Sequence, residues 1–397
     1  MPVNILILNA GSSSLKFQLY EMPSEREWCG GVAERIGKEG SSLHWHVGEN
    51  AAEEDLADSV PDHAAALQEI VSLLKRKELV GYGGIDLVVH RVVHGGIDFD
   101  APVAITKEVK AKINLLSELA PLHNPVNLRC IEVMEQLYPT TRQFAVFDTS
   151  FHRQIPAHAF RYAVSEKFYQ EDHIRVYGFH GISHQYVTGQ AGDLLENKNA
   201  KLISMHLGNG CSICAVQDGR SVDTSMGFSP VSGLVMATRS GDIDASAILQ
   251  LIRKHHLNAD QMDKVLNKQS GLYALCGMTD LRDIHKAVLA GNKEAAFACE
   301  LYAYRIKKYV GSYAAVMNGV DALIFTGGVG EHSAYIRELV CSKMDWMGIR
   351  IDHELNNRNS QAIRHISDHD SGVPILVIPT NEALEMARQV FAIEDVR

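Results

Sequence analysis

Long apolar runs are missing from this sequence. No stretch approaches the roughly 18 consecutive apolar residues that a membrane-spanning helix requires. The first twenty residues also lack the positively charged segment and the small-residue cleavage site of a secretory signal peptide. We therefore expect a cytoplasmic protein with no membrane partner.

Positive charge is scarce as well. The chain has 38 Lys and Arg against 48 Asp and Glu, which gives a formal net charge of -10 at pH 7. Nucleic-acid-binding domains usually present a basic face. The charge balance therefore argues against a nucleic-acid partner and favours solubility.

Cysteine is too rare to suggest a disulfide framework. There are 7 cysteines, an odd number, spread from Cys29 to Cys341, which suits reduced thiols. Cys211 and Cys214 form a C-x-x-C pair, but they lie in an apolar run that predicts a buried strand, where thiols are usually inert. The 19 histidines are too dispersed to indicate zinc.

Two common nucleotide-binding motifs are absent too. No G-x-x-x-x-G-K-[ST] loop occurs, and Ser333 stands where the last glycine of a G-x-G-x-x-G fingerprint would fall. Both a Walker-type ATPase and a dinucleotide-dependent dehydrogenase are therefore disfavoured.

The length of the chain predicts two domains. Its 397 residues exceed the roughly 250 to 300 at which single hydrophobic cores stop growing. The composition, 46% hydrophobic and 22% charged with 31 glycines, is typical of a globular enzyme.

Two segments share one pattern of strand, tight turn and returning strand. Residues 3–8 are almost all apolar and are followed by Asn9, residues 10–14 are small, and residues 15–20 alternate between apolar and polar. Residues 201–207, 208–210 and 212–216 repeat this order, closed by the hairpin signal at residues 218–219. Glycine and serine turns let backbone N–H groups approach an anion. Alternation also places Lys16 on the face opposite Leu15 and Phe17, so we expect two phosphate-binding loops.

Further strands at residues 85–89, 143–147, 322–325 and 375–378 alternate with helical patterns such as 294–318 and 383–391. This order predicts α/β layers, in which ligands collect beyond the carboxyl ends of strands. The residues at those ends are Asn9, Arg91, Asp148, Asn209, Gly327 to Gly330 and Glu382. The set suits phosphate and metal, and the loop at residues 326–331 could place a nucleotide at a helix N-terminus.

These motifs resemble those of the acetate and propionate kinases, within the superfamily of acetate and sugar kinases, heat-shock ATPases and actin. The resemblance runs along the whole chain. It is carried by N-A-G-S-S-S-L-K at 9–16, H-R-V-V-H-G-G at 90–96, P-L-H-N-P at 121–125, F-D-T-S-F-H at 147–152, Y-G-F-H-G at 177–181, H-L-G-N-G at 206–210, D-T-S-M-G at 223–227, T-R-S-G-D at 238–242, F-T-G-G at 325–328 and P-T-N-E at 379–382.

The resemblance implies a fold and an activity. The fold is α/β, with two actin-like (ribonuclease H-like) domains whose mixed sheets flank an active-site cleft. The first domain would hold residues 1–150 and about 384–397, and the second residues 151–383. The activity is reversible, direct in-line transfer of the ATP γ-phosphoryl group to acetate, giving acetyl phosphate and ADP. Mg²⁺, with Mn²⁺ as an alternative, would be the cofactor, and a homodimer the assembly.

Roles for individual residues follow from the same resemblance. Arg91 and Arg239 would hold the carboxylate and the transferring phosphoryl group, for which a planar guanidinium is suited. Asp148 would orient the attacking acid and organise the metal, and His180 would donate to the phosphoryl oxygens. The metal would be held by Asn9 and Glu382. The nucleotide would be held by Ser12, Lys16, His206, Leu207, Gly208, Asn209, Gly210, Asp280, Leu281, Arg282, Gly328, Val329, Gly330, Glu331 and His332.

The acyl pocket is the least determined part of the site. Val93, Leu122 and Pro230 would form its apolar wall, with Arg91 at the carboxylate. Val93 stands where propionate-preferring relatives tend to have alanine, which favours acetate. One methylene is worth only about 1 to 3 kcal/mol in discrimination, so propionate and butyrate stay open.

Several positions depart from the family pattern without removing a residue assigned to chemistry. They are Ile182, Cys211, Ser232, Ala237, Gln269, His332 and Ala383. A catalytically weak relative is therefore one alternative. Another is a nucleotide-switched ATPase of the actin type, which would have no need of the four residues Arg91, Asp148, His180 and Arg239.

Overall fold

The computed structural model describes residues 2–48, 50–55, 60–76 and 84–395. Internal contacts divide the chain into two units, and each is described by itself. Unit 1 comprises residues 1–150 and 381–397, and unit 2 comprises residues 151–380. Among the residues so described, no helix is both long and apolar enough to cross a membrane.

Unit 1 is built on a mixed sheet of eight strands in the order β5-β4-β3-β2-β1-β6-β8-β7. The strands are β1 (Val3–Ala10), β2 (Ser14–Met22), β3 (Arg26–Glu34), β4 (Ser42–Val47), β5 (Asn50–Asp55), β6 (Leu87–Val92), β7 (Val103–Ala104) and β8 (Arg142–Phe147). β1 pairs with β2 in antiparallel and with β6 in parallel orientation, and β6 is parallel to β8. The carboxyl ends of β1, β6 and β8 therefore lie along one edge of the sheet.

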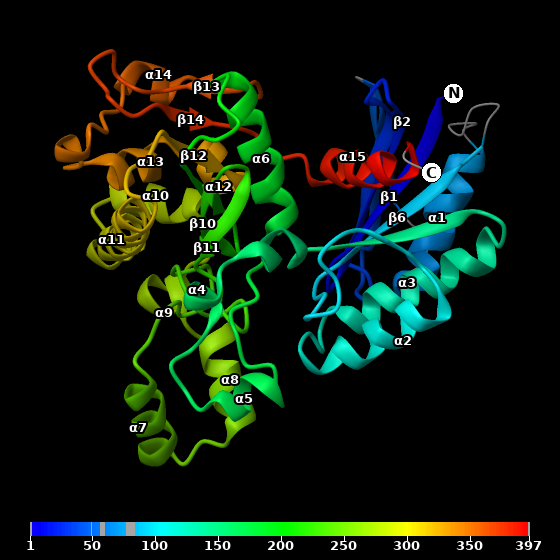
Figure 1. The fold of residues 1–397 in the computed structure, drawn as a ribbon, viewed down its shortest axis with the longest axis horizontal. Coiled ribbons are helices and arrows are strands. Elements are labelled where there is room, and N and C mark those ends of the chain that lie inside the picture. The colour runs from blue at the N-terminus through cyan, green and yellow to red at the C-terminus, as the bar shows by residue number, and fades with distance from the viewer. Residues whose placement is uncertain (1, 49, 56–59, 77–83, 396–397) are drawn as a thin grey trace. The chain divides into compact units, whose positions relative to one another are not determined.

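Helices cover both faces of this sheet (Figure 1). They are α1 (His63–Arg76), α2 (Lys107–Leu115), α3 (Asn124–Leu137) and α15 (Glu382–Asp395), with the short η1 (Leu116–Glu118). α1 and α3 pack on the face that carries Leu6, Leu8 and Phe17. α15 contacts β1, β2 and β6 from the other face, where Tyr20 donates its hydroxyl to Asn381 Oδ1 at 3.3 Å.

Unit 2 contains a second mixed sheet of six strands, ordered β11-β10-β9-β12-β14-β13. The strands are β9 (Leu202–Leu207), β10 (Cys211–Gln217), β11 (Arg220–Thr224), β12 (Ala322–Thr326), β13 (Arg364–His365) and β14 (Ile375–Val377). β9 is antiparallel to β10 and parallel to β12. The predicted hairpin between β10 and β11 is confirmed, with Asp218 and Gly219 at φ 53° and 70°.

The helices of unit 2 again cover both sheet faces. They are α4 (Ala157–Phe160), α5 (Glu166–Gln170), α6 (Gly181–Leu194), α7 (Ala245–His255), α8 (Ala259–Lys268), α9 (Gly271–Cys276), α10 (Leu281–Leu289), α11 (Lys293–Val316), α12 (Gly327–His332), α13 (Ala334–Cys341) and α14 (His353–Asn357), with η2 (Ser150–Gln154) and η3 (Asp345–Met347). Val187 and Ala191 of α6 pack on Cys214 and Ile324. α11 approaches the opposite face, since its Tyr302 hydroxyl meets Cys211 Sγ at 3.1 Å.

The predicted α/β class with mixed sheets is confirmed, and so is the helix expected at residues 294–318, observed as α11. Two local predictions are wrong. Asn9 and Arg91 lie within β1 and β6 rather than beyond them, because pairing with β2 extends β1 to Ala10 and pairing with β8 extends β6 to Val92. The expected loop at residues 326–331 is largely the short helix α12, which begins at Gly327 directly after β12.

The buried C-x-x-C pair behaves as the sequence predicts. Cys211 and Cys214 lie in β10 and are fully buried. Burial raises the pKa of Cys211 to about 11 and that of Cys214 to about 12. Both thiols therefore stay protonated at neutral pH and are poor nucleophiles and metal ligands.

Candidate active site

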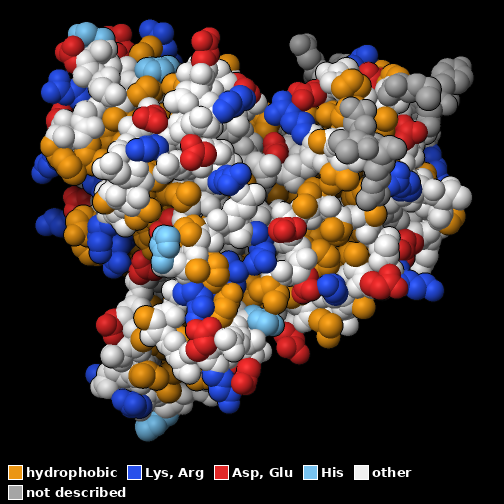
Figure 2. Space-filling model, in the orientation of Figure 1, with side chains coloured by type: hydrophobic (Ala, Val, Ile, Leu, Met, Phe, Trp, Pro, Cys, Tyr) orange, Lys and Arg blue, Asp and Glu red, His pale blue; other side chains and the backbone are white. Residues whose placement is uncertain are grey.

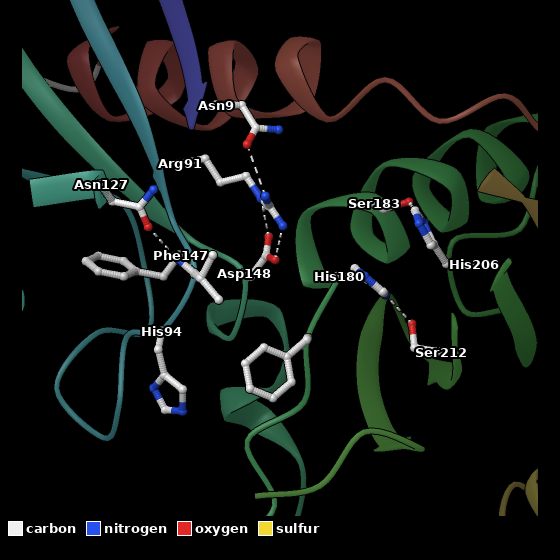
Figure 3. A network of polar contacts seen from close by, with 12 residues as sticks. Asn9, Arg91, His94, Asn127, Phe147, Asp148, His180, Ser183, His206 and Ser212 are labelled. Carbon is white, nitrogen blue, oxygen red and sulfur yellow. Dashed lines mark hydrogen bonds and ion pairs between the residues drawn. The ribbon is translucent and has the colours of Figure 1, made fainter. Parts of the chain in front are cut away.

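In unit 1, Arg91 joins side chains from three adjacent strands. Its Nε donates to Asp148 Oδ1 at 2.9 Å, its Nη2 pairs with Asp148 Oδ2, and its Nη1 donates to Asn9 Oδ1 at 3.0 Å (Figure 3). Asn9 is near the end of β1, Arg91 is in β6, and Asp148 follows β8. Because these strands are parallel, their ends bring the three side chains together at one edge. We call Asn9, Arg91, Asp148 and Glu382 the Arg91 cluster.

Charge in the Arg91 cluster is only partly balanced. The Asp148 side chain is 2% exposed and that of Arg91 17%. Burial opposes the charge of Arg91, but the carboxylates of Asp148 and Glu382 outweigh it and raise the pKa of the guanidinium. Burial raises the pKa of Glu382; Arg91 and Lys16 oppose this shift, and Asp148 adds to it. The ionised glutamate is therefore poorly compensated.

The same cluster fits a hard divalent cation. Asn9, Asp148 and Glu382 offer amide and carboxylate oxygens, the donors that Mg²⁺ prefers. The raised pKa of Glu382 marks a place where additional positive charge would be favourable. In this structure the Asn9 and Asp148 oxygens accept hydrogen bonds from Arg91.

The expected acyl wall is not assembled within unit 1. Val93 directly follows β6 and is 9% exposed, whereas Leu122 is 62% exposed. The Val93 backbone N–H donates to Asn127 Oδ1 at 3.3 Å, and Asn127 Nδ2 donates to the Ala10 carbonyl at 3.2 Å. Asn127 thus ties the ends of β1 and β6 to α3. Sequence reasoning missed it, although it lies just beyond the P-L-H-N-P motif.

In unit 2, the hairpin between β9 and β10 forms a tight loop at Gly208, Asn209 and Gly210, called the phosphate loop below. The Gly208 N–H donates to the Gly210 carbonyl at 3.1 Å. A Cβ at Gly210 would lie 3.4 Å from His180 Cε1 and 3.6 Å from Arg239 Nη1. The loop, His180 and Arg239 therefore converge. Pro230, the third member of the expected acyl wall, is half-buried in this unit.

Arg239 is a half-buried cation without a countercharge. Its Nη1 contacts Met236 Sδ at 3.8 Å, and in the described part of the chain no carboxylate forms an ion pair with it. Burial lowers the pKa of Arg239, while Cys211 acts in the opposite direction. A desolvated guanidinium beside a glycine loop is suited to bind an anion.

Two histidines stack next to this loop. The rings of His180 and His206 lie 4.3 Å apart at 24°. His180 Nδ1 is 2.9 Å from Ser212 Oγ, and His206 Nδ1 is 2.7 Å from Ser183 Oγ (Figure 3). His180 precedes α6 with φ 56° and ψ 24°, a left-handed conformation that costs a non-glycine residue about 1 kcal/mol or more. Strain of this kind often marks a functional position.

A cavity of about 1070 Å³ adjoins the phosphate loop in unit 2. The predicted nucleotide residues that line it are Gly208, Asn209, Asp280, Leu281, Arg282, Gly328, Val329, Glu331 and His332. Asp280 caps α10 and accepts from the Arg282 backbone N–H at 2.8 Å. The Arg282 side chain lowers the pKa of Asp280 to about 2. The cavity lining does not include Gly330, His206, Leu207 or Gly210.

Arg337 shapes this cavity and was not expected from the sequence. Its Nη1 donates to the Gly330 carbonyl at 2.8 Å, and its Nε donates to Asn356 Oδ1 at 2.8 Å. The side chain is almost fully buried, so these bonds hold α12 in place. The position lies in an ordinary helical pattern, which gives no sequence signal for the role.

Comparison with known proteins identifies the family of the chain. A family model described as the acetokinase family matches residues 4–388. The chain belongs to the acetokinase family. It is 48% identical to the acetate kinase of Flavobacterium johnsoniae over 392 residues, which cover 98% of this chain and 99% of that protein.

Solved acetokinase structures share the fold. The Porphyromonas gingivalis acetate kinase is 41% identical, with a TM-score of 0.91 over 99% of this chain and 100% of that chain. A propionate kinase from Francisella tularensis is 38% identical, with a TM-score of 0.92 over 98% of each chain. The chain therefore has the mixed α/β fold of this phosphotransferase family.

Departures from the acetokinase pattern are accommodated by local contacts. Cys211 Sγ donates to the Gly208 carbonyl at 3.1 Å, which supports the phosphate loop. Ser232 Oγ accepts from the Gly227 N–H at 2.9 Å. Ile182, Ala237 and Ala383 are buried, His332 lines the cavity, and Gln269 ends α8.

Proposed function

We propose that this acetokinase is an acetate kinase, which transfers the γ-phosphoryl group of ATP directly and in line to acetate, giving acetyl phosphate and ADP. The reaction is reversible and needs Mg²⁺, or Mn²⁺ in its place. The observation that carries the proposal is Arg239, a cation without a carboxylate partner among the described residues, beside the phosphate loop and His180. Phosphoryl transfer depends mainly on such positioned, charge-stabilising groups.

The Arg91 cluster would handle the acid and the metal. The Arg91 guanidinium binds the acetate carboxylate, and Asp148 orients that guanidinium through two hydrogen bonds. Asn9 and Glu382 hold the cation, whose charge neutralises phosphate oxygens when it is bound. Ser12 and Lys16 assist with hydroxyl and ammonium donors. Acetate is already ionised at neutral pH, so Asp148 orients and does not act as a base.

Unit 2 would bind the nucleotide. Backbone N–H groups of the phosphate loop donate to phosphate oxygens, while His180 and Arg239 donate to the transferring phosphoryl group. The adenosine enters the adjoining cavity, which is lined by Asp280, Arg282, Gly328, Val329, Glu331 and His332. His206 and Leu207 position the loop from the end of β9.

The acyl group is the part of the substrate with a second candidate. Buried Val93 favours acetate, whereas the structural similarity to a propionate kinase favours a longer acid. Since a methylene contributes only about 1 to 3 kcal/mol, both acids should react. We expect acetate to give the higher kcat/KM.

Initial rates with ATP and Mg²⁺ test these candidates together. Acetate, propionate, butyrate and no acceptor are compared in one assay for ADP. Acetate kinase requires the highest kcat/KM with acetate and almost no ADP without acceptor. A higher value with propionate or butyrate makes the protein a kinase of that acid. Equal ADP release with and without acceptor identifies a nucleotide-switched ATPase instead.

We also propose a homodimer that uses the α7 region and functions in the cytoplasm. α7 contains no buried residue, Leu249 is 49% exposed and Ile243 is 40% exposed. Apolar side chains are visible among charged ones on this part of unit 2 (Figure 2). Light scattering should give twice the monomer mass, and Leu249→Asp should halve it; a monomeric wild type contradicts the proposal.

The cytoplasmic location is a separate proposal. All seven cysteines are free, as suits a reducing compartment, and cell fractionation tests the location.

A further inference from the structure

A chain of buried hydrogen bonds leads away from His180 into the sheet of unit 2. His180 Nδ1 meets Ser212 Oγ at 2.9 Å, and the same hydroxyl meets His184 Nε2 at 2.7 Å. On its other side, His184 Nδ1 meets Ser204 Oγ at 2.9 Å. Ser204, His184 and Ser212 are fully buried. We call Ser204, His184 and Ser212 the histidine relay.

The fold explains why these groups line up. His180 precedes α6 and His184 lies in its first turn, where the His184 N–H donates to the His180 carbonyl at 2.9 Å and keeps the two residues one turn apart. Ser204 pairs with Cys214 and Ser212 pairs with His206 in the ladder between β9 and β10, so both serines point to one sheet face. That face is the one covered by α6.

The single hydrogen of the Ser212 hydroxyl links the protonation of His180 to that of His184. A serine hydroxyl has a single hydrogen, so Ser212 can donate to only one of its two histidine neighbours and must accept from the other. Burial, together with His152 and His206, lowers the pKa of His184 well below its ordinary value, so its ring is neutral with one N–H. In the first arrangement, Ser212 donates to His180 Nδ1 and accepts from His184, whose hydrogen is then on Nε2. In the second arrangement, Ser212 accepts from His180 Nδ1 and donates to His184 Nε2, so the hydrogen of His184 is on Nδ1.

Ser204 decides between the two arrangements. In the first, the Ser204 hydroxyl donates to His184 Nδ1, and every hydrogen in the relay has an acceptor. In the second, His184 Nδ1 carries the hydrogen and donates to Ser204, whose own hydroxyl hydrogen then needs another acceptor. Within the described residues, Ser204 Oγ has no other hydrogen-bond partner. A buried donor without an acceptor is disfavoured, so the first arrangement prevails.

We propose that Ser204, His184 and Ser212 are positioning residues that hold His180 in the tautomer with its hydrogen on Nε2. This inference rests on the proposed function, in which His180 donates a hydrogen bond to the transferring phosphoryl group. An imidazole with a bare Nε2 would present a lone pair to phosphate oxygens and repel them. The relay thus sets, from inside unit 2, the donor that the reaction uses.

Nitrogen-15 NMR of histidine-labelled protein tests the proposal, because the shifts of Nδ1 and Nε2 distinguish the tautomers. His180 is assigned by difference with His180→Gln. In the wild type, Nδ1 should be bare and Nε2 protonated. Ser212→Ala and Ser204→Ala should both mix the tautomers of His180, although Ser204 lies three hydrogen bonds away from His180. Ser221→Ala is the matched control, since this buried serine meets His152 Nδ1 at 2.8 Å outside the relay.

Kinetics supply the second measurement. Ser212→Ala should lower kcat by roughly 10-fold to 100-fold, the range seen when a group that orients a metal-ligating histidine is lost. The KM values for ATP and acetate should change by less than about threefold. Ser221→Ala should leave kcat close to wild type.

The outcomes show separately whether the histidine relay is wrong and whether the proposed function is wrong. A wild-type His180 protonated on Nδ1, or one whose tautomer is unaffected by Ser212→Ala, overturns the relay even if acetyl phosphate is formed. The wild-type spectrum alone decides the first point, so a variant that fails to fold does not block the test. A wild type that forms no acetyl phosphate refutes the proposed function, whatever the spectrum.

Discussion

Two glutamates on α15, the half-buried Glu382 and the buried Glu385, show that one residue can matter for function and another only for stability. Burial raises the pKa of Glu382, which lies beside Arg91 and Asp148. Burial also raises the pKa of Glu385, whose Oε1 accepts from Gln389 at 3.0 Å. Each carboxylate is therefore less favourable when ionised in the folded protein than in the unfolded chain, but only Glu382 belongs to the Arg91 cluster.

Replacing Glu382 by glutamine should stabilise the protein while impairing it. The folded state binds this proton more tightly than the unfolded chain, so the group's stabilising contribution is complete at low pH and is lost as pH rises through the folded pKa. Glutamine avoids that loss. At pH 7 without metal, Glu382→Gln should unfold at a higher urea concentration than wild type, while the kinase rate falls roughly 100-fold.

Glu385→Gln is the control for this experiment. It should also resist urea better than wild type, because it removes a comparable buried charge, but its kinase rate should stay unchanged. A Glu382→Gln protein that unfolds more easily than wild type, or that keeps full activity, would contradict the assignment.

Arg239 offers a second prediction at this scale. Its guanidinium has no carboxylate partner in the described residues, so removing it leaves no buried anion behind. Arg239→Ala should lower acetyl phosphate formation by about 10³-fold or more, the range found for arginines that stabilise phosphoryl transfer. ADP binding, measured by calorimetry, should change little. The control is Arg220→Ala, at the exposed start of β11, which should retain the wild-type rate. An Arg239→Ala enzyme with the wild-type rate would contradict the role assigned to Arg239.

At the scale of elements, apolar patterning predicts the central strands and the long helices. Continuous apolar runs mark β1 and β9 because both strands are buried on two faces. β3 is not predicted by this pattern, because its sequence mixes apolar, polar and glycine residues. Its pairing with β2 and β4 holds it in the sheet. α12 is read as a loop because three of its six residues are glycine, a poor helix former.

In the candidate site, too, some residues can be predicted from the sequence and others cannot. Arg91, Asp148 and Glu382 can be nominated from the sequence motifs, because the chemistry of phosphate and metal selects their residue types, but only Asp148 directly follows a strand. Asn127 and Arg337 cannot, since they act by tying together elements distant in sequence. Such support becomes visible only when tertiary contacts are known.

Gly327 tests how α12 is held against β9. It has φ 75°, and a Cβ there would lie 2.8 Å from the Leu207 carbonyl oxygen. Gly327→Ala should therefore destabilise the protein by about 1 to 3 kcal/mol and weaken ATP binding, because α12 must move. Gly328→Ala is the matched control for stability: its Cβ would meet nothing within 4 Å, so unfolding should be unchanged or harder. Equal melting temperatures for the two variants would refute this account of the contact.

At the scale of the whole molecule, the acetokinase match extends over residues 4–388 and so includes both units. Unit 1 contributes the Arg91 cluster, and unit 2 contributes the phosphate loop, His180, Arg239 and the cavity. The carboxylate-binding role proposed for Arg91 would be superfluous in a switch that only hydrolyses ATP. The presence of both sets in one chain is what distinguishes a kinase from such a switch.

Running the reaction backwards tests this central claim most directly. Purified protein is mixed with acetyl phosphate, ADP and Mg²⁺, and ATP is followed by luciferase. An acetate kinase must form ATP in proportion to the acetyl phosphate consumed, and only when all three are present. A protein that forms no ATP from acetyl phosphate, yet hydrolyses ATP at the same rate with and without acetate, would contradict the account.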